Sequence, residues 1–285
     1  MRIGNVSIDA VLDGEFALDR SIPYPDLDPT RWNDYLPLLR GGTDIVNQLG
    51  GYLIRSDDHI ALVDLGFGPT HVPTWSTGKF LDSLTALGVK PEDVTEVFFT
   101  HLHFDHIGWA ALNGDPVFPN ATHRCHARDW AHFTHPDFAD NPAMFGPEAG
   151  LDEWPRDMLT NDRLGTIAHL VETWDGNAEL ARGIEVIEFP GHTPGTSAIK
   201  ITSQGESAML IGDIAHHPAE LVESDFHFIV DMAPEESAAS QSSLVAQLAD
   251  TGMPVAGAHF QDFHWGRVIR GGTGYAWQTI DDSST

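Results

Sequence analysis

The stretch that decides the fold of this 285-residue chain is Thr100-His101-Leu102-His103-Phe104-Asp105-His106-Ile107-Gly108. It places three imidazoles and one carboxylate within six residues, directly after the apolar run 97–99. Imidazole nitrogens and carboxylate oxygens are ligands for divalent metals, and this spacing cannot be satisfied by one face of a helix. A packed core has no use for three adjacent imidazoles that all need polar partners. The stretch therefore predicts a metal-binding loop at the end of a strand.

The remaining ligands are expected at other loop tips that follow an apolar run and lie beside glycine. An alternating strand pattern over 184–189 leads into a turn rich in Pro and Gly that presents His192. The buried run 208–211 leads through Gly212 to Asp213, and the run 255–258 ends at His259. The recurrence of this pattern predicts a single site built from several loops.

The order of these residues, with Asp64 in the segment 63–66, resembles the metallo-β-lactamase superfamily over nearly the whole chain. The resemblance implies an α+β four-layer αββα sandwich, with the active site at the edge between the two β-sheets. It also implies two divalent metal ions, with Zn²⁺ expected and Mn²⁺, Co²⁺ or Fe²⁺ accepted by the same ligands. Asp64 would orient a ligand histidine. The implied ligands are His101, His103 and His192 for one metal, Asp105, His106 and His259 for the second, and Asp213 as the bridge.

Within the superfamily, the β-lactamases of the commonest type carry a cysteine at the Asp213 position and a lysine for the drug carboxylate. This chain has Asp213 and only three lysines, which disfavours a β-lactamase. The first motif and the turn 190–195 resemble the acyl-homoserine lactonases. The segments 258–260, 266–270 and 274–277 resemble the methyl parathion hydrolase branch.

The predicted function is a dinuclear metal-dependent hydrolase of the lactonase or esterase kind. A hydroxide bridging the two metals would attack a lactone or carboxylic ester, and promiscuous phosphotriester activity is left open. The predicted catalytic residues are Asp105, through its metal, and His216. The lactonase pattern has a tyrosine three residues after the bridging aspartate, where this chain has His216. His216 is therefore our candidate proton donor to the leaving group.

Two other functions stay open at this point. The first is a thioesterase resembling glyoxalase II, although the basic helices that such a resemblance needs for glutathione are not evident in the carboxy-terminal segment. The second is a redox or non-catalytic metal-binding protein. Electron-transfer members of the superfamily carry a glutamate in the first motif and an appended flavin domain, and neither is expected here. Seven intact ligands argue against a non-catalytic protein.

The composition limits the partners. There are 15 basic residues against 42 acidic ones, a formal charge of −27, so nucleic acid is not an expected partner and a small-molecule substrate is. No run of eighteen apolar residues predicts a membrane helix, and no apolar signal segment is evident, so a soluble cytoplasmic protein is expected. Cys125 is the only cysteine, and alternation in a strand over 122–126 would put it and His123 on one face, which predicts a buried thiol.

The whole chain, 1–285, is expected to form a single domain. Strands are predicted near 3–12, 47–55 and 60–63, then a helix over 77–87 and a strand before His101. The second half predicts strands near 185, 197 and 208, a helix over 234–248 and a strand before His259.

Two segments stand outside this pattern. An N-terminal arm, 1–40, contains a proline-rich part over 21–29, which would cover a second subunit in a homodimer, cover the rim of the pocket, or pack on its own sandwich. An aromatic insertion, about 129–175, is expected between the two halves, near the active site. The pocket candidates are Trp109, three residues after His106, together with His264 and, from the insertion, Phe145.

Overall fold

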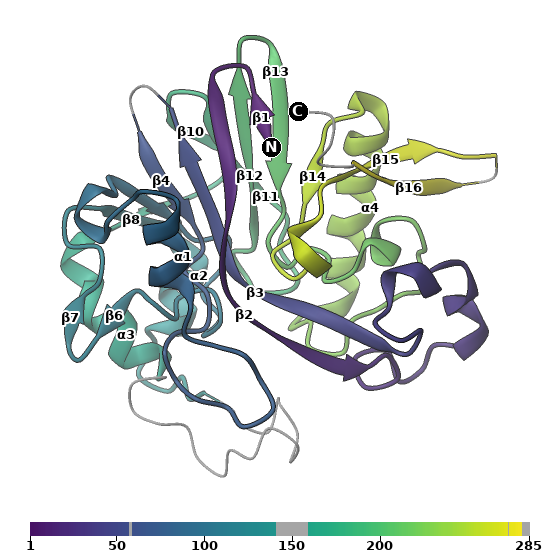
Figure 1. Ribbon diagram of the computed structural model, residues 1–285, viewed down its shortest axis with the longest axis horizontal. Coiled ribbons are helices and arrows are strands. Elements are labelled where there is room, and N and C mark those ends of the chain that lie inside the picture. The colour runs from purple at the N-terminus through teal and green to yellow at the C-terminus, as the bar shows by residue number, and fades with distance from the viewer. Residues whose placement is uncertain (57–58, 141–158, 273, 281–285) are drawn as a thin grey trace.

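Two mixed β-sheets face each other and carry helices on their outer sides, which is the predicted αββα sandwich (Figure 1). The computed structural model describes residues 1–56, 59–140, 159–272 and 274–280. The first sheet has seven strands in the order β1 (Arg2–Ile3), β2 (Val6–Asp19), β3 (Asp44–Arg55), β4 (Ile60–Val63), β5 (Glu96–Phe98), β8 (Thr122–His126) and β9 (Val171–Trp174).

The second sheet also has seven strands, and it follows the first in sequence. Its order is β10 (Ala178–Ala181), β11 (Ile184–Glu188), β12 (Ser197–Ser203), β13 (Glu206–Leu210), β14 (Val255–Ala256), β15 (Gly266–Arg270) and β16 (Tyr275–Thr279). A small hairpin of β6 (Ala111–Leu112) and β7 (Asp115–Pro116) stands apart from both sheets. Strand β5 is paired in parallel with β4, and β14 is paired in parallel with β13. In each sheet, the loops that follow these two parallel strands therefore leave the sheet at the same edge.

The helices cover the outer faces. The described part of the chain contains four α-helices, α1 (Phe80–Ala86), α2 (Ala127–Phe133), α3 (Thr160–Ile167) and α4 (Pro234–Thr251). The first three lie over the first sheet and α4 lies over the second (Figure 1). Helix α4 begins with proline, has two glutamates in its first turn and ends at Gly252 in the left-handed conformation, as the sequence rules for helix ends predict.

Three apolar layers hold the sandwich together. Ile54, Val63 and Phe98 from the first sheet pack with Ile199 and Leu210 from the second, in the layer between the sheets. A second layer lies between the first sheet and its helices, and a third lies under α4. Each sheet buries both of its faces, which explains why the inner strands β3, β4 and β5 are almost continuously buried.

The predicted N-terminal arm needs a correction, because its first half belongs to the sheet. Strand β2 extends to Asp19 and pairs with β3 along its whole length, with a bulge between Leu12 and Gly14. The proline-rich part packs on its own chain, where Tyr24 and Trp32 are buried against Phe226. Two short 3₁₀-helices, Pro29–Asp34 and Leu36–Leu38, complete this segment. A homodimer contact stays a prediction.

The predicted insertion is also shorter than 129–175. Its last part forms β9, the edge strand of the first sheet, and its first residues lie in α2. Residues 141–158 lie outside the described part of the chain. Strand β8 confirms the predicted alternation, since His123 and Cys125 are both buried and Cys125 is a free thiol.

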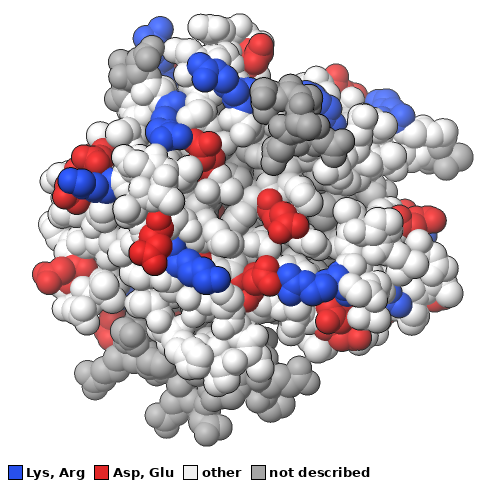
Figure 2. Space-filling model, in the orientation of Figure 1, with Lys and Arg blue, Asp and Glu red and all other residues white. Residues whose placement is uncertain are grey.

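Charged side chains of both signs are interspersed on the face shown in Figure 2, and the basic ones form no broad patch there. Among the helices of the described residues, none combines the length and the apolar character that crossing a bilayer requires.

Candidate metal centre

All seven predicted ligands come together at one edge of the sandwich. The first motif follows β5 in the first sheet, and the other three loops come from the second sheet. His192 lies between β11 and β12, Asp213 follows β13, and His259 follows β14. Five of the seven side chains are buried, and the other two, His103 and Asp105, line a pocket. The site is thus formed by residues from widely separated parts of the chain.

The first group of ligands is a cluster of three imidazoles. Nδ1 of His103 lies 3.0 Å from Nε2 of His101 and 2.9 Å from Nε2 of His192. Burial, reinforced by the neighbouring imidazoles, holds the pKa of His101 and of His103 well below the usual histidine value. These rings are therefore neutral at pH 7, the form in which histidine can bind a metal.

The second group combines imidazole nitrogens with carboxylate oxygens. Nε2 of His259 lies 3.5 Å from Oδ2 of Asp105, and Nε2 of His106 lies 4.0 Å from Oδ1 of the same carboxylate. Asp213 lies between the two groups. Its Oδ1 is 3.3 Å from Nε2 of His106, and its Oδ2 is 3.5 Å from Nε2 of His192. This is the position that a bridging carboxylate needs.

The electrostatics of the second group favour bound positive charge. Burial opposes ionisation of Asp213, but His106 and His259 hold the pKa of this carboxyl well below its usual range. Burial likewise opposes charging of His106, yet Asp213 and Asp64 raise its pKa well above the usual value. The carboxylates thus attract a cation, which can be a proton on His106 or a metal ion.

The donor set fits two divalent ions. Among the described residues, Nε2 of His106 and Oδ1 of Asp213 are buried atoms with no hydrogen-bond partner, and both face the centre. Three nitrogens in one group and two nitrogens with a carboxylate in the other, joined by a shared aspartate, match the coordination that zinc accepts.

Ligand histidines also make hydrogen bonds through Nδ1, the ring nitrogen that points away from the centre. Asp64 receives a hydrogen bond of 2.9 Å at Oδ2 from Nδ1 of His106, and it also accepts the backbone N–H and the hydroxyl of Thr100. The predicted role of Asp64 agrees with this geometry. Nδ1 of His259 donates to the backbone carbonyl of Gln48 at 2.8 Å. Such contacts fix the ring and leave the inner nitrogen free for a metal.

Two residues that position the candidate ligands, Asp231 and Arg163, were not predicted from the sequence. Asp231 accepts the Nδ1–H of His192 at 2.9 Å, and its only sequence signal is that it follows an apolar run, 228–230. Arg163 of α3 is buried and donates to the backbone carbonyls of Phe104 and Phe67. It therefore anchors the loop that carries Asp105. Arg163 is far from this loop in sequence, so no local pattern predicts the contact.

His216 faces the centre. Its Nε2 lies 3.1 Å from Oδ2 of Asp213, and its ring stacks on Phe228 with the ring centres 3.6 Å apart. Glu220 accepts the backbone N–H groups of His216 and His217 with one oxygen, and its other oxygen lies 3.9 Å from Nδ1 of His216. Burial opposes the charge, but Asp213 and Glu220 raise the pKa of His216 to about 10.

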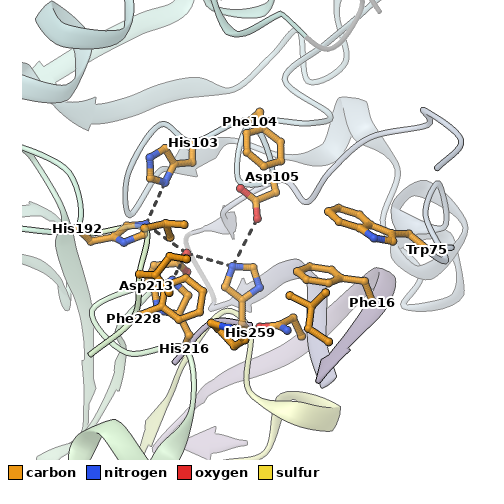
Figure 3. A pocket seen from close by; sticks show the side chains of 15 residues that line it. Phe16, Trp75, His103, Phe104, Asp105, His192, Asp213, His216, Phe228 and His259 are labelled. Carbon is orange, nitrogen blue, oxygen red and sulfur yellow. Dashed lines mark hydrogen bonds and ion pairs between the residues drawn. The ribbon is translucent and has the colours of Figure 1, made fainter. Parts of the chain in front are cut away.

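An apolar pocket opens onto the ligands (Figure 3). One wall comes from the β2–β3 pair and the loop after Asp64, the other from the segment 228–230. Phe16 and Trp75 stack with centroids 4.1 Å apart on the first wall, beside Phe104. Among the described residues that line the pocket, none is a lysine or an arginine. The lining residues besides the ligands are Phe16, Leu18, Pro23, Asn47, Trp75, Phe104, His216, Phe228, Ile229 and Val230.

Two of the three pocket residues proposed from the sequence, Trp109 and His264, are not among the described residues that line it. Trp109 is buried in the layer between the first sheet and its helices, and its indole N–H donates to Asp13 at 3.0 Å. His264 is exposed and does not line the pocket. Phe145 lies outside the described residues. Proximity in sequence to a ligand therefore did not identify the pocket.

One further group of metal-capable side chains, His126, Asp175 and Glu188, lies away from the centre. Nδ1 of His126 accepts the N–H of Arg128, so Nε2 carries the proton and donates it to Glu188. Glu188 also binds the guanidinium of Arg128 and the N–H of Gly176. The group is thus satisfied by its own hydrogen bonds and needs no metal.

Known proteins resemble this chain in sequence and in fold. The family model described as the metallo-beta-lactamase superfamily matches residues 51–259. An N-acyl homoserine lactonase of Bacillus cereus is 24% identical over 195 residues, which are 62% of this chain and 67% of the lactonase. A probable metallo-hydrolase of Mycobacterium tuberculosis is 26% identical over 202 residues, 59% of this chain and 57% of that protein.

The solved structures of two hydrolases share the fold. AidC, a dizinc quorum-quenching lactonase in complex with its product, has a TM-score of 0.84 at 24% identity, over 99% of this chain and 96% of its own. AbOPH, a hydrolase in the beta-lactamase superfamily, has a TM-score of 0.81 at 23% identity over the same shares. Since the family model spans most of the sequence and includes the ligand loops, the chain belongs to the metallo-β-lactamase superfamily.

Proposed function

We propose that this protein is a dinuclear metal-dependent hydrolase of lactones or carboxylic esters with an apolar substituent. The observation that carries the proposal is that seven metal-capable side chains converge at the base of an apolar pocket whose described lining has no lysine or arginine. Relatives named as N-acyl homoserine lactonases support the same class of reaction.

The two groups of ligands would hold one divalent ion each, most readily Zn²⁺, with Asp213 between them. Ions held in this way lower the pKa of a shared water and polarise the oxygen of the substrate on which negative charge develops. The protein itself excludes bulk water from one side of the centre through Phe104 and Phe228, and it presents an uncharged wall to the substrate.

His216 would supply the proton that the leaving alkoxide needs when the ester bond breaks. Its Nε2 faces Asp213, and Glu220 holds the backbone on which it is carried. A lactone or an ester leaves as an alcohol, so a proton donor beside the ligands is chemically required at this position or from solvent. Asp105 lies in the pocket wall and would act as a ligand that fixes the second metal.

The pocket favours neutral substrates over charged ones. A substrate carboxylate or phosphate monoester would leave water without a lysine or arginine of the described lining to pair with, which is costly. Acyl lactones, aryl esters and neutral phosphotriesters avoid this cost. Phosphotriester hydrolysis is thus proposed as a side activity.

The test is to purify the protein, determine its metal content, reconstitute it with zinc, manganese or cobalt, and assay a substrate panel. The panel should contain homoserine lactones of several acyl lengths, aryl esters, an organophosphate triester and a glutathione thioester. Two equivalents of metal with turnover of a lactone or ester are expected. Preference for the thioester, or activity that survives complete removal of the metal, would contradict the proposal.

A further inference from the structure

The loops that carry the three imidazoles of the first group come from different sheets. His101 and His103 follow β5, whereas His192 lies between β11 and β12. No strand pairing fixes the distance between these loops, because the sheets pack face to face through side chains. The backbone N–H of Ser197 donates to the carbonyl of Thr100 at 2.9 Å, which is one link between them.

A single buried carboxylate, Asp129, makes the second link. Its Oδ2 accepts the N–H of Leu102 at 3.2 Å and the hydroxyl of Thr193 at 2.9 Å. Its Oδ1 accepts the N–H of Gly195 at 2.6 Å. Leu102 lies between two of the predicted ligands, and Thr193 directly follows the third, so one side chain contacts both loops beside their ligands.

The contact leaves no room for a larger residue on the second loop. A Cβ on Gly195 would lie 2.9 Å from Oδ1 of Asp129 and 2.7 Å from Cβ of His126, both closer than such atoms approach. The glycine therefore allows the backbone of the His192 loop to reach the carboxylate. This requirement is separate from the φ/ψ freedom that usually explains a glycine in a turn.

Burying the carboxylate of Asp129 costs free energy. It lies in the first turn of α2 and is fully buried, and no lysine or arginine of the described chain forms an ion pair with it. Burial raises the pKa of Asp129 to about 6, although its hydrogen bonds from Thr193, Gly195 and Leu102 act in the opposite direction. A buried carboxylate with three donors from two loops is better explained by positioning than by stability.

We propose that Asp129 is a positioning residue for the metal held by His101, His103 and His192, because it fixes the spacing of the two loops. It touches neither the pocket nor the ligand nitrogens. The inference rests on the metal binding in the proposed function and is independent of which substrate is hydrolysed.

The experiment measures zinc stoichiometry and the two dissociation constants, by elemental analysis and by competition with a chromophoric chelator. Asp129→Asn removes the charge and leaves a single acceptor oxygen. Thr193→Val removes one donor and keeps the shape of the side chain. Asp137→Asn is the control, because the Asp137 side chain is 92% exposed.

In Asp129→Asn we expect one equivalent of zinc to bind about 10–100-fold more weakly, because removing a residue that orients metal ligands typically has an effect of this size. The second equivalent should keep its wild-type affinity. Thr193→Val should weaken the same equivalent by a smaller factor, and Asp137→Asn should weaken neither. His101→Ala identifies the equivalent: in that background, Asp129→Asn should leave the remaining zinc unaffected.

Wild-type affinity for both equivalents in Asp129→Asn and Thr193→Val would overturn the inference. So would equal weakening of both equivalents, or an Asp129→Asn variant that does not fold combined with wild-type zinc binding in Thr193→Val. Near-ultraviolet circular dichroism reports the fold in each case. A wild-type protein that binds two zinc ions and hydrolyses no ester or lactone would contradict the proposed function and leave the role of Asp129 intact.

Discussion

The Nδ1–H of His192 donates a hydrogen bond of 2.9 Å to Oδ1 of Asp231, a carboxylate whose side chain is only 6% exposed. The bond turns Nε2 of the ring toward the centre. Asp231→Ala should weaken binding of one metal by about 10–100-fold, since partners of ligand histidines contribute this much. Asp231→Asn keeps a hydrogen-bond acceptor and should weaken binding of this metal less.

The measurement is competition with a chelator at fixed pH. Glu235→Gln, an exposed change four residues away, is the control and should bind both metals as the wild type does. Equal affinities in the Ala and Asn variants would show that the hydrogen bond to His192 does not matter.

Replacing His216 tests the proton donor. His216→Ala should keep two metals and lose about 10²–10⁴-fold in kcat on esters with poor leaving groups, because these need a proton most. Esters of acidic phenols should be much less affected. His227→Ala, an exposed neighbour, is the control. An equal loss on both kinds of ester would argue against proton donation, and unchanged kcat would remove His216 from the reaction.

The stacked pair of Phe16 and Trp75 should set the preference for apolar substituents. Trp75→Ala exposes the face of Phe16 and removes one side of the wall. For long acyl chains we expect kcat/KM to fall by about 5–30-fold, equivalent to roughly 1–2 kcal/mol of lost apolar contact. An acetyl ester is the internal control and should be hydrolysed at nearly the wild-type rate. The same loss on both substrates would place the effect at the metals.

Removal of the metals should destabilise the protein. The centre brings several buried imidazoles and two carboxylates together, and a ligand that binds only the folded state adds stability by mass action, about 4 kcal/mol at a concentration 1,000 times its Kd. Dialysis against a chelator should lower the Tm, and returning zinc should restore it. A Tm that does not depend on zinc would mean that the centre does not bind it tightly.

His123 should make stability depend on pH. Burial lowers the pKa of His123 to about 4, and Nδ1 donates to the carbonyl of Ala121. Because the folded-state pKa lies below that of the unfolded chain, the neutral ring stabilises the fold above about pH 6.5. This stabilisation is lost as the pH falls toward 4, by up to about 3 kcal/mol.

Urea unfolding of the wild type and of His123→Leu at several pH values between 7 and 4 measures this loss of stability. The metal ligands titrate in both proteins, so the difference between the two isolates His123. The variant should lose less stability than the wild type as the pH falls. Parallel pH profiles would contradict the assignment.

The convergence of the seven candidate ligands could be predicted from the sequence because each one follows an apolar strand in a short loop, and these are local signals. The limits of β4 agree with the prediction for the same reason. The strand predicted near 3–12 ends too early, because β2 continues to Asp19. In the structure Asp13 lies in a bulge, and its carboxylate accepts the N–H groups of Phe67 and Gly68.

The pocket could not be predicted in this way. Trp109 is three residues from a ligand, but its indole N–H is satisfied by Asp13, 96 residues away, which draws the ring into the core. Trp75 and Phe16 meet only because the loop after Asp64 crosses the β2–β3 pair. Contacts of this kind depend on the packing of whole elements, and periodicity does not encode them.

The long β2–β3 ribbon has a consequence for how this enzyme can change. Phe16 and Asn47 are paired across the ribbon and line the pocket, while the next residue, Gln48, orients His259 through its carbonyl. A substitution that reshapes this wall therefore also disturbs a metal ligand. Adaptation to a new substrate should be easier through Trp75, because the loop after Asp64 can be redesigned while the ribbon keeps His259 in place.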